Sequence, residues 1–288
     1  MSRELVLSKR MQSVADRISD GLVLADVGCD HGYLSIWLCQ TGKIPAAIAM
    51  DVNKGPLERA AQNVALYGLK DRIQLRLSDG LMKLKAGEVE SIAIAGMGGM
   101  LTIRILSARP DILSEVKELV LEPQSDVEGV RRFLGECGFV IVDEDMVLED
   151  GKFYPVIRAV HREAVGSSIG TSGSCGTNSS IGASGSCGAN SSIGASGSCG
   201  VNGTDSIKLV DASDALNAAM DETIALRFGR ILLEKKHPVL KEFLERNLVQ
   251  TEELRQRLEA NPTGKGLARA EELKKEAECM KAALGYYK

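Results

Sequence analysis

The sequence of 288 residues is poor in several residue types, and each shortage argues against a class of protein. Aromatic residues make up only 4%, and the three histidines, His31, His161 and His237, are too scattered to predict a metal site. The seven cysteines are odd in number and form no C-x-x-C pair, which disfavours a disulfide framework. No apolar run is long enough for a membrane span, and the N-terminal segment does not resemble a secretory signal. We therefore expect a cytoplasmic protein without metal or membrane, and nothing in the sequence indicates an oligomeric state.

The sequence also lacks a large excess of either charge, with 35 Lys and Arg against 39 Asp and Glu. The net charge is −4 and the isoelectric point is near 5.6, which argues against a generally basic nucleic-acid binder. Residues 227–288 are different, because they hold 14 Lys and Arg against 10 Asp and Glu. A local basic surface is therefore expected near the C-terminal end, although the same charges would also serve to solvate exposed helices.

Three copies of a twelve-residue unit divide the chain at residues 167–202: SSIGTSGSCGTN, SSIGASGSCGAN and SSIGASGSCGVN. Glycine and serine dominate, so this segment can bury little apolar surface in return for the entropy it would lose on ordering. We predict a flexible linker at 166–206 between domains at 1–165 and 207–288. Two minor alternatives stay open, a small β-stack built on the repeated isoleucines and a metal site built on the repeated cysteines Cys175, Cys187 and Cys199.

The segment before the repeats predicts an α/β fold. Short apolar runs alternate with amphipathic stretches such as 54–66, a pattern typical of a parallel sheet covered by helices on both faces. The last two runs are separated by a short turn, so they should form a hairpin that adds an antiparallel strand. A seven-stranded, mostly parallel sheet of this kind resembles the Rossmann-like fold of class I methyltransferases. The predicted strands are 22–27, 46–50, 72–77, 91–95, 118–122, 139–148 and 153–160.

After the repeats the pattern predicts an antiparallel pair of helices. The first helix carries an apolar or small-polar seam at spacings of four and three, and residues 260–266 interrupt it. A second helix with a less regular apolar face follows. The expected contact positions are Leu240, Leu244, Asn247, Thr251, Leu254 and Leu258 in the first helix, and Leu267, Ala270, Leu273, Ala277, Met280 and Leu284 in the second.

The stretch LADVGCDHGYLS, residues 24–35, places a glycine-containing turn directly after the first strand. Gly28 and Gly32 do not complete the G-x-G-x-x-G spacing that dinucleotide sites use. Asp26 and Asp30 flank the turn where a pyrophosphate would have to lie, and carboxylates there would repel it. The turn instead suits a cofactor that carries an ammonium and a sulfonium, which is S-adenosylmethionine.

The following strands end in further candidate ligands for this cofactor. Asp51 ends the second strand and could accept both ribose hydroxyls, or serve only as an acid at a helix N-terminus. Asp79 follows the third strand and could accept the adenine amino group, with Gly80 letting the backbone approach the ring. Gly96 and Met97 end the fourth strand in AGMGG and would contact the ligand, unless they form only a tight strand-to-helix turn.

Five motifs together resemble the bacterial tRNA (adenine(22)-N1)-methyltransferase family. The resemblance covers residues 1–162 and resumes at 232–244, whereas the twelve-residue repeats depart from the family pattern. It implies methylation of N1 of an adenine in the D-arm of tRNA, with the adenine flipped out of its stack. The motifs are LVLSKRM at 5–11, ADVGCDHGYL at 25–34, IAGMGGML at 94–101, LVLEPQSD at 119–126 and LEDGKFYPVI at 148–157.

Within this resemblance, Asp30 is the candidate that holds the adenine amino group, while His31 and Tyr33 are candidates for orienting or stacking. His31 could equally be a packing side chain at a helix N-terminus. Two other functions remain as alternatives, a methyltransferase with another RNA, a protein or a small molecule as acceptor, and a non-catalytic RNA-binding scaffold. The expected contacts to tRNA phosphates are Lys9, Arg10, Lys235, Lys236 and Lys241.

Overall fold

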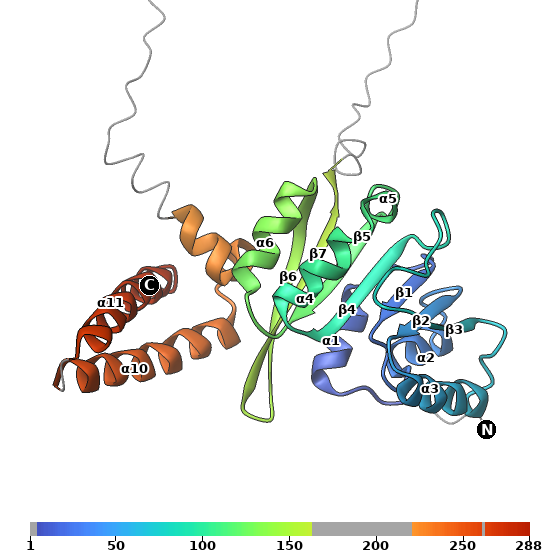
Figure 1. The fold of residues 1–288 in the computed structure, drawn as a ribbon, viewed down its shortest axis with the longest axis horizontal. Helices are drawn as coiled ribbons and strands as arrows, with labels where there is room; N and C mark the ends of the chain where they lie inside the picture. The colour runs from blue at the N-terminus through green and yellow to red at the C-terminus, as the bar shows by residue number, and fades with distance from the viewer. Residues whose placement is uncertain (1–4, 163–220, 261–262) are drawn as a thin grey trace, which may run out of the picture.

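A computed structural model describes residues 5–162, 221–260 and 263–288 (Figure 1). The predicted linker at 166–206, with its repeats and its two alternatives, lies outside these residues. No helix in the described ranges is long and apolar enough to cross a membrane. The same ranges contain no group of three or more His, Cys, Asp or Glu side chains that could hold a metal ion.

The sheet has seven strands in the order β3-β2-β1-β4-β5-β7-β6. The first five strands are parallel, while β7 runs antiparallel to both β5 and β6, as the sequence predicts. Each predicted strand agrees with an observed one to within two residues at either end. The strands are β1 Leu24–Val27, β2 Ala47–Asp51, β3 Ile73–Leu77, β4 Ser91–Met97, β5 Glu118–Pro123, β6 Phe139–Glu149 and β7 Lys152–His161.

Helices cover both faces of the sheet because the buried strands are apolar on both sides. In β4, Ile92 and Ile94 pack into one core with the residues of α4, α5 and α6, whereas Ala93 faces a second core with those of α1, α2 and α3. The predicted helix at 54–66 is α3, Lys54–Leu66. The others on the sheet are α1 Lys9–Arg17, α2 Tyr33–Gln40, α4 Gly99–Ser107, α5 Pro110–Leu113 and α6 Val127–Glu136.

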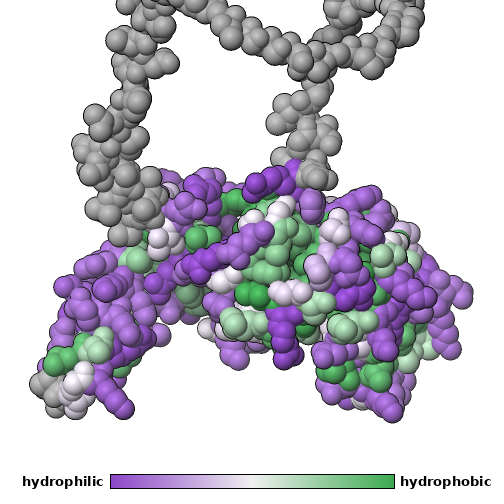
Figure 2. Space-filling model, turned by 45° about the horizontal axis from the view of Figure 1, so that its top comes forward, coloured by the Kyte–Doolittle hydropathy of each residue, from purple (hydrophilic) through white to green (hydrophobic). Residues whose placement is uncertain are grey.

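The C-terminal part forms an arm that projects from the β6 end of the sheet (Figure 1). It includes the helical residues 221–228, α9 Arg230–Glu234 and the two predicted helices, α10 Pro238–Ala260 and α11 Gly264–Gly285. A third core joins this arm to the sheet, because Met146 of β6 packs with Phe228, Leu232 and Leu240. Figure 2 shows that hydrophilic side chains cover most of the arm.

The predicted contact seam of the two helices is buried near the sheet and only partly buried toward the tip, where Ala270 and Leu273 are still covered. Leu240, Leu244 and Thr251 are buried, but Leu254 is 44% exposed and Leu267 is 50% exposed. The reason is physical: near the sheet a helix of the pair has both its partner helix and β6 to cover it, whereas near the tip it has only its partner.

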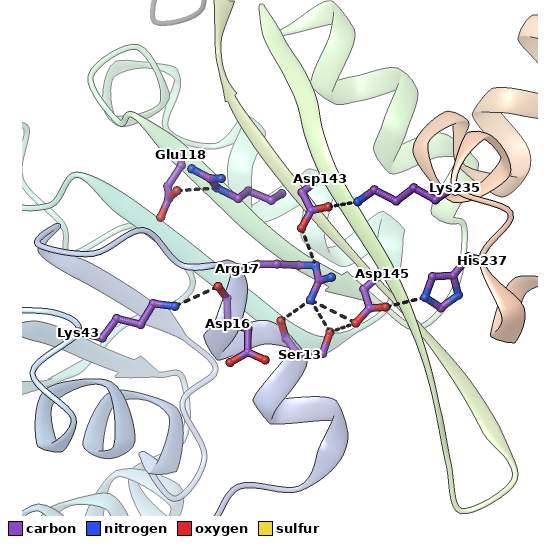
Figure 3. Close-up of polar contacts among 10 residues, drawn as sticks. Ser13, Asp16, Arg17, Lys43, Glu118, Asp143, Asp145, Lys235 and His237 are labelled. Carbon is purple, nitrogen blue, oxygen red and sulfur yellow. Dashed lines mark hydrogen bonds and ion pairs between the residues drawn. The ribbon is translucent and has the colours of Figure 1, made fainter.

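Polar contacts also attach helices to β6 (Figure 3). Asp145 accepts a hydrogen bond from the Ser13 hydroxyl of α1 at 2.6 Å, and it lies 2.9 Å from Nε2 of His237, just before α10. Asp143 binds Arg17 of α1 at 3.2 Å and Lys235 at 2.7 Å. These two aspartates therefore tie α1 and the arm to the same strand.

Candidate active site

The turn after β1 has an unusual backbone. Gly28, Asp30 and Gly32 have φ angles of +75°, +49° and +72°, so the chain enters the left-handed region at every second residue. The backbone N–H groups of Gly28 and Cys29 both donate to the carbonyl oxygen of Met50, at 2.8 and 2.9 Å. The turn is thus held against the end of β2, and it leads into α2 at Tyr33.

Gly28 also leaves room for a side chain from another strand. A Cβ atom there would lie 2.2 Å from Cε of Met97, which packs directly over the turn from the end of β4. The two glycine-containing strand ends that the sequence singles out therefore lie in contact with each other. Gly32 has a different role, because its missing Cβ faces Ala60 of α3 at 3.4 Å.

Asp26, the second-last residue of β1, has a buried carboxylate. It accepts a hydrogen bond from the Ser35 hydroxyl at 2.7 Å, which links it to α2. The pKa of Asp26 is raised to about 6, mainly by burial and to a smaller extent by the nearby charge of Asp51, while the hydrogen bonds from Ser35 lower it. The carboxylate is therefore ready to be stabilised by a cation placed at the turn.

The three predicted catalytic residues form the rim of the turn. Asp30 is exposed and lies 3.6 Å from Nε2 of His31 and 3.8 Å from the guanidinium of Arg59. The rings of His31 and Tyr33 are stacked, with centroids 5.5 Å apart and planes at 13°. An acceptor oxygen and a flat aromatic pair are thus presented side by side.

A cavity of about 360 Å³ opens at this turn. Twelve residues line the cavity, of which seven are predicted site residues and five are not. The selected ones are Arg10, Asp26, Gly28, Asp30, His31, Tyr33 and Gly96, and the others are Met11, Cys29, Leu34, Ala95 and Gln124.

The remaining predicted cofactor ligands lie beside this cavity and do not line it. Asp51 ends β2, and one of its carboxylate oxygens accepts the Asn53 N–H at 2.8 Å, at the entry to α3. The next strand ends alongside, because the Ser78 N–H donates to the carbonyl of Asp51. Asp79 follows on the surface, while the missing Cβ of Gly80 faces Ile105 of α4 at 2.8 Å. Gly80 therefore makes room for a core side chain, which is a reason for this glycine that the sequence analysis did not give.

Arg10 and Glu122 form an ion pair at the floor of the site. The Arg10 guanidinium donates to Glu122 at 2.8 Å, and the same carboxylate oxygen accepts the Gly96 N–H at 3.1 Å. The other oxygen, Oε1, is buried and has no hydrogen-bond partner among the described residues. Burial raises the pKa of Glu122 to about 7, against the opposing effect of Arg10.

The predicted tRNA contacts do not gather at the cavity. Arg10 lies in it, but Lys235 pairs with Asp143, Lys236 donates to the carbonyl of Lys288 and Lys241 lies 3.8 Å from Glu245. Lys9 is exposed at the start of α1. Their contact with RNA stays a prediction.

The sequence analysis missed three polar residues at the site. Glu122 and Gln124 belong to the quoted LVLEPQSD motif, and their place at the end of a parallel strand was the signal that pointed to them. Arg59 gave no such signal, because it lies within a helix and reaches Asp30 only through the packing of α3 beside the turn.

Comparison with known proteins assigns this arrangement to a family. A family model described as a methyltransferase domain matches residues 7–157, more than half of the chain and all of the strands up to the middle of β7. The chain belongs to this methyltransferase family. A methyltransferase domain thus accounts for the sheet, the turn after β1 and the cavity beside it.

Three relatives extend the comparison. The methyltransferase is 41% identical over 156 residues to the tRNA (adenine(22)-N(1))-methyltransferase of Bacillus subtilis, a match that covers 54% of this chain and 66% of that protein, just under two thirds of its length. A crystal structure of the B. subtilis tRNA (m1A22) methyltransferase is 28% identical, with a TM-score of 0.71 and coverage of 98% and 100% of the two chains. A Streptococcus pneumoniae structure in complex with S-adenosyl-L-methionine, described provisionally as a tRNA (m1A22) methyltransferase, is 28% identical, with a TM-score of 0.68 over 97% and 100%.

Proposed function

We propose that this protein transfers a methyl group from S-adenosylmethionine to N1 of an adenine in the D-arm of tRNA, adenine 22. The observation that carries the proposal is the match in fold along nearly the whole chain, arm included, to a B. subtilis structure named for that reaction. The sheet alone would not identify the substrate, because one fold serves many functions. A tRNA substrate also implies a cytoplasmic reaction.

The residues at the turn fit S-adenosylmethionine. The carboxylates of Asp26 and Asp30 suit its ammonium and sulfonium charges, and the left-handed turn allows close approach of the backbone. The Arg10 guanidinium in the same cavity suits the carboxylate of the methionine part. Asp51 would accept hydrogen bonds from the ribose hydroxyls of the cofactor, and Asp79 would accept one from the amino group of the cofactor's adenine. Gly96 and Met97 would contact the cofactor from β4.

When bound, the cofactor supplies an electrophilic methyl group on a sulfonium sulfur. Adenine N1 has an in-plane lone pair, so the protein needs no strong base and acts mainly by orienting the reactants and excluding water. Asp30 would accept a hydrogen bond from the adenine amino group and stabilise the positive charge that the base gains. The stacked rings of His31 and Tyr33 would hold the flipped base in plane.

Two measurements on the full chain test the proposal. Calorimetric titration with S-adenosylmethionine should show binding at one site, and tritium from labelled cofactor should pass to unmodified tRNA. An RNA-binding scaffold would bind tRNA and not the cofactor. A methyltransferase for proteins or small molecules would bind the cofactor and leave tRNA unlabelled.

A further inference from the structure

A second cavity of about 560 Å³ lies between the β6–β7 hairpin and α10. In Figure 1 the hairpin projects past the sheet, with α1 on one side and α10 on the other. Gln124 lines both this cavity and the one at the turn, so the two are adjacent. We call it the arm groove. Its lining consists of Gln124, Gly151, Lys152, Phe153, Tyr154, Phe243, Arg246, Asn247 and Gln250.

Two aromatic rings and a guanidinium group are in contact in the arm groove. Arg246 lies over the ring of Phe153 at 5.5 Å, and Phe153 packs edge-on against Phe243 at 5.2 Å. On the other face of the hairpin, Arg10 of the turn cavity lies over the ring of Tyr154, the next residue of β7, at 5.1 Å. Ring and cation contacts therefore occur on both faces of the hairpin, between the turn cavity and the arm groove.

The charge and polarity of the lining favour an anionic, base-bearing ligand. Lys152 and Arg246 are its charged residues, and no carboxylate is among the lining residues. Lys152 is exposed and forms no ion pair with another described residue, whereas Arg246 is paired with Glu242, one turn earlier in α10. The amides of Gln124, Asn247 and Gln250 supply both donors and acceptors for base edges.

We propose that the arm groove binds the single-stranded RNA that flanks the target nucleotide, by stacking bases on its aromatic rings and pairing phosphates with Lys152 and Arg246. The inference rests on the proposed function, because a base that enters the turn cavity must leave its stack and deprive its neighbours of stacking partners. Aromatic and arginine surfaces next to that cavity replace the lost stacking. This groove, rather than the lysines around α9, then sets the register of the substrate.

The test compares two matched variants of α10. Arg246→Gln removes the groove guanidinium and its ion pair with Glu242, whereas Arg257→Gln removes an exposed guanidinium and the equivalent pair with Glu253, outside the groove. The double variants Lys152→Gln/Arg246→Gln and Lys274→Gln/Arg257→Gln extend the comparison, because Lys274 is an exposed lysine of α11 outside the groove. Each is titrated with unmodified tRNA at several salt concentrations, and cofactor affinity is measured in parallel.

The groove double variant should bind tRNA about tenfold more weakly or worse at low salt, because hydrogen bonds to charged groups are lost. Its salt slope should fall by about 0.7 for each phosphate contact removed, the single-strand value. Cofactor affinity should stay unchanged. Ultraviolet cross-linking of the wild type should attach tRNA nucleotides flanking adenine 22 to the peptide that holds Phe153 and Tyr154.

Equal losses in both pairs of variants would overturn the inference, since they would indicate only the general charge of the arm. The inference would also be overturned if the groove variants bound and methylated tRNA as well as the wild type did and no cross-link formed at 153–154. That result would leave the proposed function intact. A wild type that neither binds nor methylates tRNA would refute the proposed function and the groove together. If the groove bound an acidic peptide and did not bind RNA, the inference would be wrong and the groove would be assigned to a protein partner.

Discussion

Three carboxylates lie at or just after the ends of adjacent parallel strands. The common location of Asp26, Asp51 and Asp79 could be predicted from the sequence because the carboxyl ends of parallel strands share one edge of the sheet, while their contacts with the cofactor stay a proposal. The pairing of Glu122 with Arg10 could not, because it joins residues 112 positions apart through the packing of α1 against the sheet. Local patterns indicate which side chains reach an edge, and long-range packing determines which of them meet.

At Asp51 we expect a loss of cofactor binding. Asp51→Ala removes the proposed acceptor for the ribose hydroxyls of the cofactor and should weaken S-adenosylmethionine binding by about 1.5–3 kcal/mol, the usual contribution of hydrogen bonds to a charged group. Asp71→Ala, an exposed acid near the start of β3, is the control. Calorimetry provides the measurement, and an unchanged dissociation constant for Asp51→Ala would remove this residue from the site.

Glu122 should make stability depend on pH in a defined direction. Its pKa is about 7 in the folded protein and near its ordinary value of 4.5 when unfolded, so the folded state binds more protons between these values. The stabilisation is therefore complete below about pH 4.5 and is lost as the pH rises through 7, at up to about 1.4 kcal/mol per pH unit. Glu122→Gln should remove this decline. The stability of the variant relative to that of the wild type should therefore increase as the pH rises from 5 to 8.

Urea denaturation at pH 5, 6, 7 and 8 measures the effect, with the exposed Glu115→Gln as control. The wild type and the Glu115 variant should follow the same profile, while the Glu122 variant is flatter. Parallel profiles for all three proteins would mean that Glu122 titrates normally in the folded state.

At the scale of elements, hydrophobic periodicity predicts the seven strands, α3 and the two long helices well, because each has an apolar side buried against the next layer. The exposed tip residues Leu254 and Leu267 are where the same reasoning fails. A heptad-like pattern specifies which side of a helix is apolar, but it does not specify how far along its length a second covering element extends.

The attachment of the arm depends on a buried ion pair. Arg131 of α6 donates to Glu144 of β6 at 2.8 Å and to the backbone carbonyls of Leu226 and Arg227 at 2.9 Å each. Glu144 in turn accepts the N–H of Ile231 in α9 at 3.2 Å. Two side chains of the catalytic part thus satisfy backbone groups at the base of the arm.

Arg131→Leu should therefore destabilise the protein by about 3–5 kcal/mol, because it leaves the carboxylate of Glu144 buried and unpaired. The neighbouring Arg132→Leu breaks an exposed pair with Glu128 and should change stability by less than about 1 kcal/mol. Chemical denaturation distinguishes the two. Similar midpoints for both variants would show that the buried pair does not hold the arm in place.

At the scale of the whole molecule, the arm and the sheet share a core although the repeats separate them in sequence. Met146 of β6 packs with Ile224 and Phe228, which are among the first described residues after the repeats. Residues that precede the repeats and residues that follow them therefore pack against each other and hold the arm to the sheet. We keep the division into parts at 1–165, 166–206 and 207–288 as a proposal about chain organisation.

Deleting residues 167–202, with the flanks joined by a short Gly/Ser bridge, should leave the melting temperature and methyl transfer nearly unchanged. The reason is that the entropic cost of closing a flexible loop rises only logarithmically with its length, while the contacts of the arm stay intact. Thermal unfolding and the tritium assay measure both quantities. A large loss of either would mean that the repeats fold or take part in function.

The most direct test of the account is to map the methyl group. The full chain is incubated with S-adenosylmethionine and an unmodified tRNA transcript, and nuclease fragments are then analysed by mass spectrometry. The account predicts one methyl group on N1 of adenine 22 in the D-arm, and no transfer to a transcript with guanine at that position. A methyl group on another nucleotide, or equal transfer to both transcripts, would contradict it.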